Sequence, residues 1–227
     1  MTSSSTEPAK TLLQCDFDGT ITEKDVSFLM LDTFADGDWK ELLTEYRAGR
    51  LLVGDFNTRV FAMIKQDRQT LVNFTRQTGR VRAGFHELID YCRQRGFRFT
   101  IVSNGLDFYI DTILADAGVE GIDVFAAQTK FAPGGLQVNY IGPDGMQLRS
   151  DFKETYTRTF LSQGYRVIYL GDGLSDMAAA RHARHIFARH QLLDLCQQTK
   201  LNFTPFTDLH DVVRVLELLR QGLTPEC

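Results

Sequence analysis

The sequence lacks cysteine pairs at metal-binding or disulfide-framework spacing. Its four cysteines, Cys15, Cys92, Cys196 and Cys227, are scattered and form no Cys-x-x-Cys motif. This distribution argues against both a disulfide-stabilised secreted domain and a structural zinc site. We therefore expect reduced thiols, as in a cytoplasmic protein.

Long apolar runs and known nucleotide-binding loops are missing too. No stretch approaches the length of a membrane span, and the leader MTSSSTEPAK holds no apolar signal core. We therefore expect no membrane partner and a flexible tail over residues 1–10. Neither Gly-x-Gly-x-x-Gly nor Gly-x-x-x-x-Gly-Lys occurs, which disfavours a dinucleotide or ordinary nucleoside triphosphate site.

An excess of positive charge is missing as well. The 25 basic and 29 acidic residues leave a net charge of −4, which argues against general affinity for nucleic acids. A small phosphate-bearing substrate is still compatible with this charge, because a metal ion or a local positive pocket can bind it.

The patterns that are present predict an α/β fold. With 227 residues and 43% hydrophobic side chains, the chain can form one large domain or a core with a small insert. An apolar run at 11–15 is typical of a buried strand. Four amphipathic segments follow between residues 25 and 78, and each opens with an aspartate suited to a helix N-cap: Asp25, Asp38, Asp55 and Asp67.

After residue 80, strand and helix patterns alternate, which predicts a parallel sheet with helices on both faces. The expected strands are 97–102, 124–128, 167–170 and 186–188, with a hairpin-like stretch near 134–145. The expected helices are 87–95, 108–117, 152–162 and 175–184, followed by two more near the C-terminus. We therefore predict a Rossmann-like core over 11–24 and 80–222, with a small α-helical bundle inserted at 25–79.

Three of the expected strands end in polar clusters: CDFDGT, VSNG and LGDGLSD. Ligands of parallel sheets bind beyond the carboxyl ends of the strands, so these clusters should converge. The clusters would then form an oxygen-rich site of the kind that holds Mg²⁺ through carboxylates, waters and a substrate phosphate. The carboxylates concerned are Asp16, Asp18, Asp172 and Asp176.

Such a site suits phosphoryl transfer. One carboxylate of the Asp-x-Asp pair can attack phosphorus, while its neighbour protonates the leaving alcohol and then activates water. The Ser103 hydroxyl and the main-chain N–H groups of Asn104 and Gly105 suit a phosphate oxygen. Lys153, at a helix start, can stabilise charge developing on the phosphoryl group.

These motifs also resemble a known family. Their order and approximate spacing are similar to the four motifs of the haloacid dehalogenase superfamily, and the likeness covers nearly the whole chain. The second aspartate favours a phosphatase over a dehalogenase, and the helical insert resembles the cap of the phosphoserine-phosphatase-like branch. The matching residues are Asp16 to Thr20, Ser103 to Gly105, Lys153 and Gly171 to Asp176.

The resemblance assigns a role to each motif residue. It implies that Asp16 is the nucleophile and Asp18 the general acid/base. It implies a Mg²⁺ site made by Asp16, the main-chain carbonyl of Asp18 and Asp172, with Asp176 supporting the metal or the lysine. It also implies a set of residues that bind the phosphoryl group: Thr20, Ser103, Asn104, Gly105 and Lys153.

Within that branch the chain resembles the phosphatases of methionine salvage that act on a methylthiopentenyl phosphate enol. Three stretches carry this likeness: Thr22 to Asp25, SNGLDFYI from Ser103, and the tail FARHQLLDLCQQTKLNFTPF from Phe187. Asp25 stands where phosphoserine phosphatases usually have a glutamate that binds the substrate amine. Arg59 lies near the cap position at which those enzymes bind the serine carboxylate. Each of these two is a candidate substrate contact.

Other interpretations remain open from sequence alone. Phosphoserine and general sugar-phosphate phosphatases are rivals within the class, and a catalytically idle binding module is a rival outside it. Taken singly, the Asp-x-Asp pair could be a solvated turn, and Asp25 could form a capping interaction with Thr22. The histidines of RHARHIFARH fit a cationic helix end better than a zinc site. We expect the protein to be a monomer or a homodimer.

Overall fold

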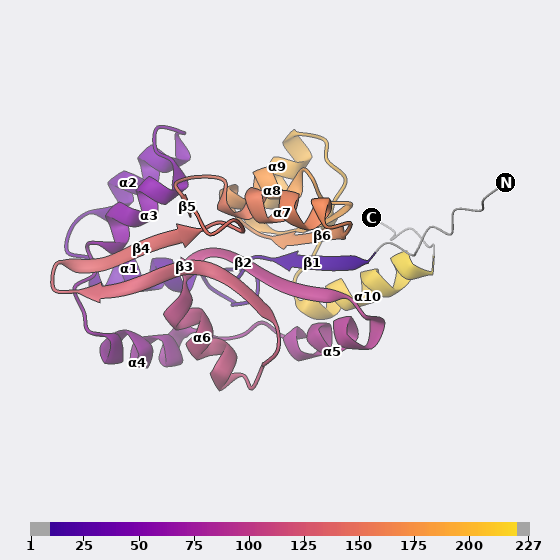
Figure 1. Ribbon diagram of the computed structural model, residues 1–227, viewed down its shortest axis with the longest axis horizontal. Helices are drawn as coiled ribbons and strands as arrows, with labels where there is room; N and C mark the ends of the chain where they lie inside the picture. The colour runs from indigo at the N-terminus through magenta and orange to yellow at the C-terminus, as the bar shows by residue number, and fades with distance from the viewer. Residues whose placement is uncertain (1–9, 222–227) are drawn as a thin grey trace.

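Residues 10–221 are described by the computed structural model, and they fold around one eight-stranded sheet (Figure 1). The strand order is β5-β4-β3-β2-β1-β6-β7-β8. All neighbours from β3 to β8 pair in parallel, whereas β4 and β5 are antiparallel additions at one edge. The predicted α/β class is therefore confirmed. Residues 1–9 of the expected tail and residue 222 of the expected core lie outside the described residues.

The elements have the following bounds. The strands are β1 Thr11–Cys15, β2 Arg98–Leu106, β3 Asp123–Ala132, β4 Gly135–Ile141, β5 Gln147–Leu148, β6 Arg166–Gly171, β7 His185–Ala188 and β8 Thr204–Pro205. The helices before β3 are α1 Val26–Phe34, α2 Trp39–Arg47, α3 Val53–Phe61, α4 Arg68–Thr78, α5 Phe85–Arg95 and α6 Asp107–Asp116. Those after it are α7 Phe152–Ser162, the 3₁₀ turn η1 Leu174–Asp176, α8 Met177–Ala180, α9 His190–Gln198 and α10 Leu209–Arg220.

Strand β1 lies in the middle of the parallel sheet. Its apolar residues are inaccessible to solvent, as expected for a strand buried on both faces. Cys15 pairs in register with Ile101 of β2 and with Leu170 of β6. Strands β1 and β6 therefore end at almost the same level, and Ser103 of β2 lies just beyond it, which brings the polar residues of all three segments to one edge of the sheet.

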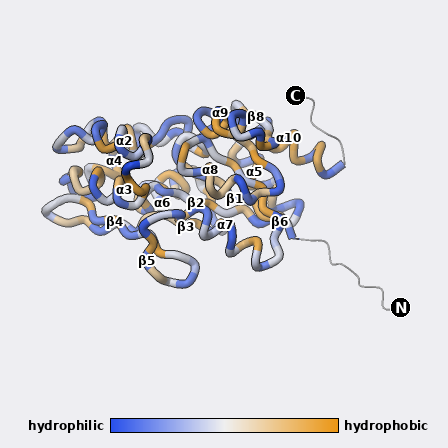
Figure 2. Tube along the Cα trace, turned by 90° about the horizontal axis from the view of Figure 1, so that it is seen from above, coloured by the Kyte–Doolittle hydropathy of each residue, from blue (hydrophilic) through white to orange (hydrophobic). Residues whose placement is uncertain are grey.

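Helices cover both faces of the sheet, as the alternating pattern predicted. Figure 1 shows α5, α6 and α10 on one side and α7, α8 and α9 on the other. Figure 2 shows hydrophobic stretches along the interior of the trace and hydrophilic ones in the peripheral turns. Among the helices of residues 10–221, none is long and apolar enough to cross a membrane. The cytoplasmic location and the oligomeric state stay predictions.

Three expected elements differ from the structure, and one of them is β3, which continues to Ala132 instead of ending at Gln128. Strand β2 continues to Leu106 instead of ending at Val102, and its pairing with β3 shifts register between these two residues. The predicted helix at 175–184 is instead the short turn η1 followed by the four-residue α8. The polar sequence after β6 forms contacts within its own loop, and these interrupt regular helix there.

Helices α1–α4 form the expected helical insert, and three of the four predicted N-caps are present. Asp25, Asp38 and Asp67 each accept a main-chain N–H of the following helix. The prediction for Asp55 is wrong, because α3 already begins at Val53. The Asp55 carboxylate instead forms an ion pair with an arginine of the loop before α7, at 2.8 Å.

The β3–β4 hairpin connects this helical insert to the sheet. The main-chain N–H of Leu136, on β4, donates to the carbonyl of Ile64, which follows α3. At the opposite end of α3, in its first turn, the N–H of Gly54 donates to the carbonyl of Arg149, which lies in the loop before α7. Figure 1 shows the hairpin reaching away from β1 toward α1–α3. The domain boundary at 25–79 stays a prediction.

Candidate active site

A pocket of about 320 Å³ lies where the carboxyl ends of the central strands face helices α1–α3. The structure brings together most of the residues that the sequence singled out, because the following line this pocket: Asp16, Asp18, Asp25, Ser103, Asn104, Gly105, Lys153 and Asp172. Thr20 and Asp176 are buried behind it, where each contacts a lining residue. Arg59, by contrast, is exposed and does not line the pocket.

The Lys153 ammonium connects the first and last motifs. Its Nζ lies 2.8 Å from Asp16 Oδ1 and 2.6 Å from Asp176 Oδ1, and all three side chains are buried. Burial raises the pKa of Asp16 well above its ordinary value, as does the Asp176 charge, while the lysine opposes this rise. Burial by itself lowers the pKa of Lys153, but the two carboxylates outweigh it and raise the pKa above its ordinary value. Lys153 is therefore charged.

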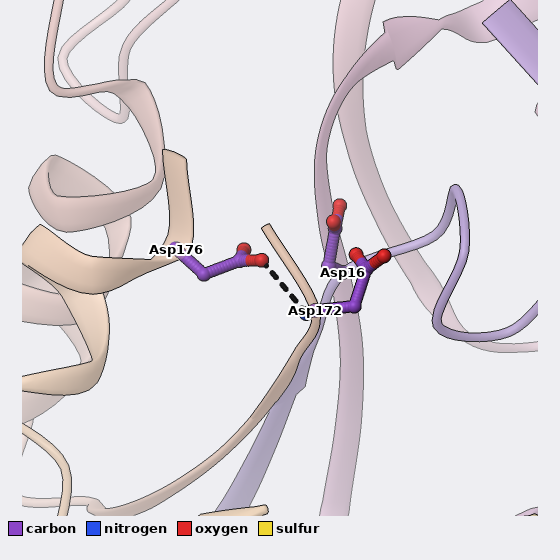
Figure 3. A group of neighbouring side chains, drawn as sticks. All are labelled: Asp16, Asp172 and Asp176. Carbon is purple, nitrogen blue, oxygen red and sulfur yellow. Dashed lines mark hydrogen bonds between the residues drawn. The ribbon is translucent and has the colours of Figure 1, made fainter. Parts of the chain in front are cut away.

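Three carboxylates converge closely enough to hold a cation. One ligand oxygen from each of Asp16, Asp172 and Asp176 lies within 4.8 Å of the others (Figure 3). The Asp176 oxygens are already occupied by Lys153, the Tyr169 hydroxyl and two main-chain N–H groups. Asp16 and Asp172 make fewer contacts, so their oxygens retain acceptor capacity for a metal ion. The donor set therefore fits a hard, oxygen-preferring divalent cation.

Gly19 lets the loop after β1 pass close to Asp172. Its φ is +72°, and a Cβ at this position would collide with the Asp172 carboxylate. The next residue, Thr20, places its hydroxyl 3.3 Å from Asp172 Oδ1. Thr20 thus contacts the acidic cluster directly, and its role in phosphate binding stays a prediction.

Asp18 lies in a buried site where its proton is retained. Burial, together with the nearby Asp25 charge, raises the pKa of Asp18 to about 8. Its oxygens accept hydrogen bonds from the main-chain N–H of Val26, at 2.9 Å, and from the Tyr109 hydroxyl. A carboxylic acid that is protonated near neutral pH can donate a proton to a leaving group.

Tyr109 is a site residue that the sequence interpretation missed. It is fully buried on α6, and it lies beside Gly105 and the Asp18 carboxyl group. A signal existed, because Tyr109 lies within the recognised SNGLDFYI stretch. One helical turn from the end of β2 places it back over the site.

Asp25 has the structural role that the sequence predicted for it. It is the N-cap of α1, where its Oδ1 accepts from the Phe28 N–H at 2.8 Å and from the Ser27 hydroxyl at 2.6 Å. The predicted capping interaction with Thr22 is absent, because the Thr22 hydroxyl donates to main-chain carbonyls. Burial raises the pKa of Asp25 to about 6, although both hydrogen bonds lower it. A substrate contact by Asp25 stays a prediction.

The wall formed by α1–α3 is largely apolar. Its Tyr46 and Phe56 rings stack with centroids 5.2 Å apart, and Phe28 packs against Trp39 behind it. Arg47, His190 and Gln191 are polar lining residues that sequence reasoning did not assign to the site. The apolar residues with which this wall lines the pocket are Phe28, Leu43, Tyr46, Val53 and Phe56.

Arg82 holds the loop after β1 in place. Its buried guanidinium donates to the main-chain carbonyls of Gly19 and Thr20 at 2.9 and 2.8 Å, and to that of Thr22 at 2.9 Å. Glu23 and Thr207 supply further carbonyls at 3.3 Å. The loop that carries the Asp-x-Asp motif thus depends on one side chain contributed from beyond α4.

We expect Arg82→Met to destabilise the fold by about 2–3 kcal/mol, since several buried carbonyls lose their donor at once. Urea unfolding followed by circular dichroism measures this change. Arg76→Met is the matched control, because Arg76 forms only an exposed ion pair with Asp116 at 3.1 Å. Equal effects of the two substitutions would contradict the assigned role of Arg82.

The comparison with known families is consistent with this geometry. The model of the haloacid dehalogenase-like hydrolase family matches residues 13–181, more than half of the chain. That span includes the Asp-x-Asp motif, Ser103, Lys153 and Asp172.

Curated relatives match over nearly their whole length. The chain is 29% identical over 218 residues to the 2-hydroxy-3-keto-5-methylthiopentenyl-1-phosphate phosphatase of Brevibacillus brevis, covering 93% of this chain and 97% of that protein. It is 30% identical over 211 residues to the enzyme of the same name from Geobacillus kaustophilus, covering 91% and 95%.

Solved structures share the fold at lower identity. A phosphoserine phosphatase determined as a phospho-aspartyl intermediate analogue superposes with a TM-score of 0.68 at 16% identity, covering 94% of this chain and 99% of that one. Phosphoserine phosphatase from T. onnurineus gives 0.67 at 20% identity, covering 94% and 98%. The matching family, and the motifs that the pocket brings together, show that this chain is an enzyme belonging to the haloacid dehalogenase-like hydrolases.

Proposed function

We propose that this protein is a Mg²⁺-dependent phosphatase that hydrolyses a small phosphate monoester through an aspartyl-phosphate intermediate. The observation that carries the proposal is the placement of Asp16 beside the Lys153 ammonium, in one pocket with Asp18 and Ser103. Relatives of about 30% identity that are named phosphatases support the reaction class.

In the first half-reaction, an Asp16 carboxylate oxygen attacks phosphorus, and the bond from phosphorus to the ester oxygen breaks. The leaving oxygen takes the proton that Asp18 holds. In the second half-reaction, the Asp18 carboxylate removes a proton from water as the water oxygen attacks phosphorus. Inorganic phosphate leaves, and the Asp16 carboxylate and the Asp18 acid are both regenerated. Lys153 and the Ser103 hydroxyl stabilise the phosphoryl oxygens throughout.

Asp16 and Asp172 would hold the Mg²⁺ ion, with the Asp18 carbonyl as the predicted third protein ligand. When bound, the ion offsets the charges of carboxylates and phosphate and polarises the phosphoryl group. Asp176 contributes indirectly, because it fixes Lys153 and the main chain at Asp172.

Removing the metal should abolish activity. We expect EDTA to stop phosphate release and added Mg²⁺ to restore it, and we expect Asp172→Asn to raise the Mg²⁺ concentration for half-maximal activity by more than about tenfold. A Mg²⁺-dependent rise in melting temperature, lost in Asp172→Asn, reports binding independently. Asp194→Asn, an exposed aspartate of α9, is the control. Full activity in EDTA would refute the metal requirement.

For the substrate, we propose 2-hydroxy-3-keto-5-methylthiopentenyl-1-phosphate. The apolar wall of Phe28, Tyr46 and Phe56 suits a methylthio end, with the phosphate held at the opposite, polar end of the pocket. The names of the curated relatives support the same substrate.

Phosphoserine is the second candidate, and Arg47 is the observation that favours it, since this arginine lines the pocket and could pair with a carboxylate. Phosphate release should be compared across the enol phosphate, phosphoserine, and sugar and nucleotide monophosphates. Preference for the enol supports our proposal. Preference for phosphoserine that falls in Arg47→Ala, but not in Arg59→Ala, would establish the alternative. No release from any ester would favour an idle binding module.

A further inference from the structure

A chain of buried polar contacts connects α3 and β4 to the main chain next to Ser103. Asn57, on α3, and Tyr140, on β4, are both buried. Asn57 Nδ2 lies 2.5 Å from the Tyr140 hydroxyl oxygen, and this hydroxyl donates to the Asn104 carbonyl at 2.6 Å. Asn57 Nδ2 also lies 3.3 Å from the same carbonyl. Three segments that are distant in sequence therefore meet at one main-chain oxygen.

The other side of this peptide group contacts Ser103. The Asn104 carbonyl and the Gly105 N–H belong to one planar peptide unit and point in opposite directions. The Gly105 N–H donates to Ser103 Oγ at 3.0 Å. Because the serine oxygen accepts this bond, its own proton is free to be donated to an acceptor in the pocket.

The sheet itself does not fix this peptide. Asn104 and Gly105 lie in the part of β2 where the register with β3 shifts, between Val102 and Leu106. A regular ladder of hydrogen bonds is interrupted there, so side-chain contacts set the orientation of the peptide plane.

We propose that Tyr140, assisted by Asn57, positions the Ser103 hydroxyl for the phosphoryl group by holding the Asn104–Gly105 peptide in one orientation. Tyr140 is a positioning residue, because it lies behind the peptide and acts through it. The inference rests on the proposed function in that Ser103 binds a phosphoryl group. The inference makes phosphate binding depend on Tyr140 and Asn57 as well, two residues that lie outside the recognised motifs.

Tyr140→Phe tests the inference because it removes only the hydroxyl. We expect kcat/KM for the preferred ester to fall about five- to tenfold, and the dissociation constant for inorganic phosphate, measured by calorimetry, to rise by a similar factor. Tyr156→Phe is the matched control. Tyr156 is also buried, and its hydroxyl also donates to a main-chain carbonyl, but this carbonyl is that of Ile141, at 3.0 Å, and not that of the peptide beside Ser103. Equal effects of the two substitutions on phosphate binding would overturn the inference.

A double-mutant cycle separates positioning from general loosening of the structure. Because Tyr140 acts through Ser103, Tyr140→Phe should add little further loss of phosphate affinity in a Ser103→Ala background. The same additional loss in both backgrounds would show that Tyr140 does not act through the serine. If Tyr140→Phe fails to fold, Asn57→Ala tests the same contacts from the other end, with the same two expectations.

The outcomes also distinguish this inference from the proposed function. Should the wild-type protein hydrolyse none of the esters, the proposed function fails, while the phosphate-binding measurements still decide the role of Tyr140. Should hydrolysis be strong but Tyr140→Phe match Tyr156→Phe, the proposed function stands and the inference fails.

Discussion

Asp16→Asn should reduce phosphate release by at least about 10⁴-fold, because the amide has the shape of the carboxylate but cannot act as the nucleophile. The remaining pocket still contains Lys153, Ser103 and Asp18, so substrate binding should weaken far less than turnover. Steady-state kinetics would therefore show the loss in kcat. A second measurement is specific to the mechanism: rapid acid quench and mass spectrometry should detect phosphate on Asp16 in the wild-type chain and none in the variant.

Asp36→Asn is the matched control for this substitution. Asp36 is exposed and pairs with Lys65 at 2.7 Å, outside the pocket. We expect it to leave kcat unchanged. Substantial turnover by a folded Asp16→Asn chain would refute the covalent mechanism and favour direct attack by water.

Lys153→Met should have the largest combined effect on stability and activity. The substitution leaves the buried Asp16 and Asp176 carboxylates without the cation that contacts both, and breaking such a buried pair costs about 3–5 kcal/mol. Loss of the charge that stabilises the phosphoryl oxygens should lower kcat by about 10²–10³-fold. Urea unfolding in EDTA measures the first effect, because a bound metal would otherwise compensate for the missing charge.

Two further variants define the cause of this loss. Lys65→Met removes an exposed lysine from an ion pair, so it should cost less than about 1 kcal/mol. Lys153→Met combined with Asp176→Asn removes a buried charge along with the lysine, so part of the stability should return while activity stays low. If Lys153→Met is as stable as the wild-type protein in EDTA, the ion pairs do not carry the stabilisation that their geometry indicates.

Patterns local in sequence predicted much of this protein. The convergence of the three polar clusters followed from a general property of parallel sheets, and the register of Cys15 with β2 and β6 shows why it holds. The N-caps at Asp38 and Asp67 follow from short-range hydrogen bonding, which depends only on the next few residues.

The features that were missed depend on contacts between distant segments. Asp55 has the sequence context of an N-cap, but the main-chain bond between Gly54 and Arg149 lets α3 begin earlier. Arg82 and Tyr140 have no distinctive neighbours in sequence. Each is important because it donates a hydrogen bond to a main-chain carbonyl of a segment that is distant in sequence and close only in the fold. The local periodicity of a sequence does not predict such contacts.

The central position of β1 also constrains how the protein is made. Its partner β2 begins at Arg98 and its other partner β6 at Arg166, so β1 gains one neighbour long before the second during synthesis. A nascent chain that has not yet released β6 from the ribosome has one open edge on β1 and no Asp172 beside Asp16. The acidic site can therefore assemble only after Asp172 has left the ribosome, and until then β1 presents an unpaired apolar strand edge, which is prone to aggregation.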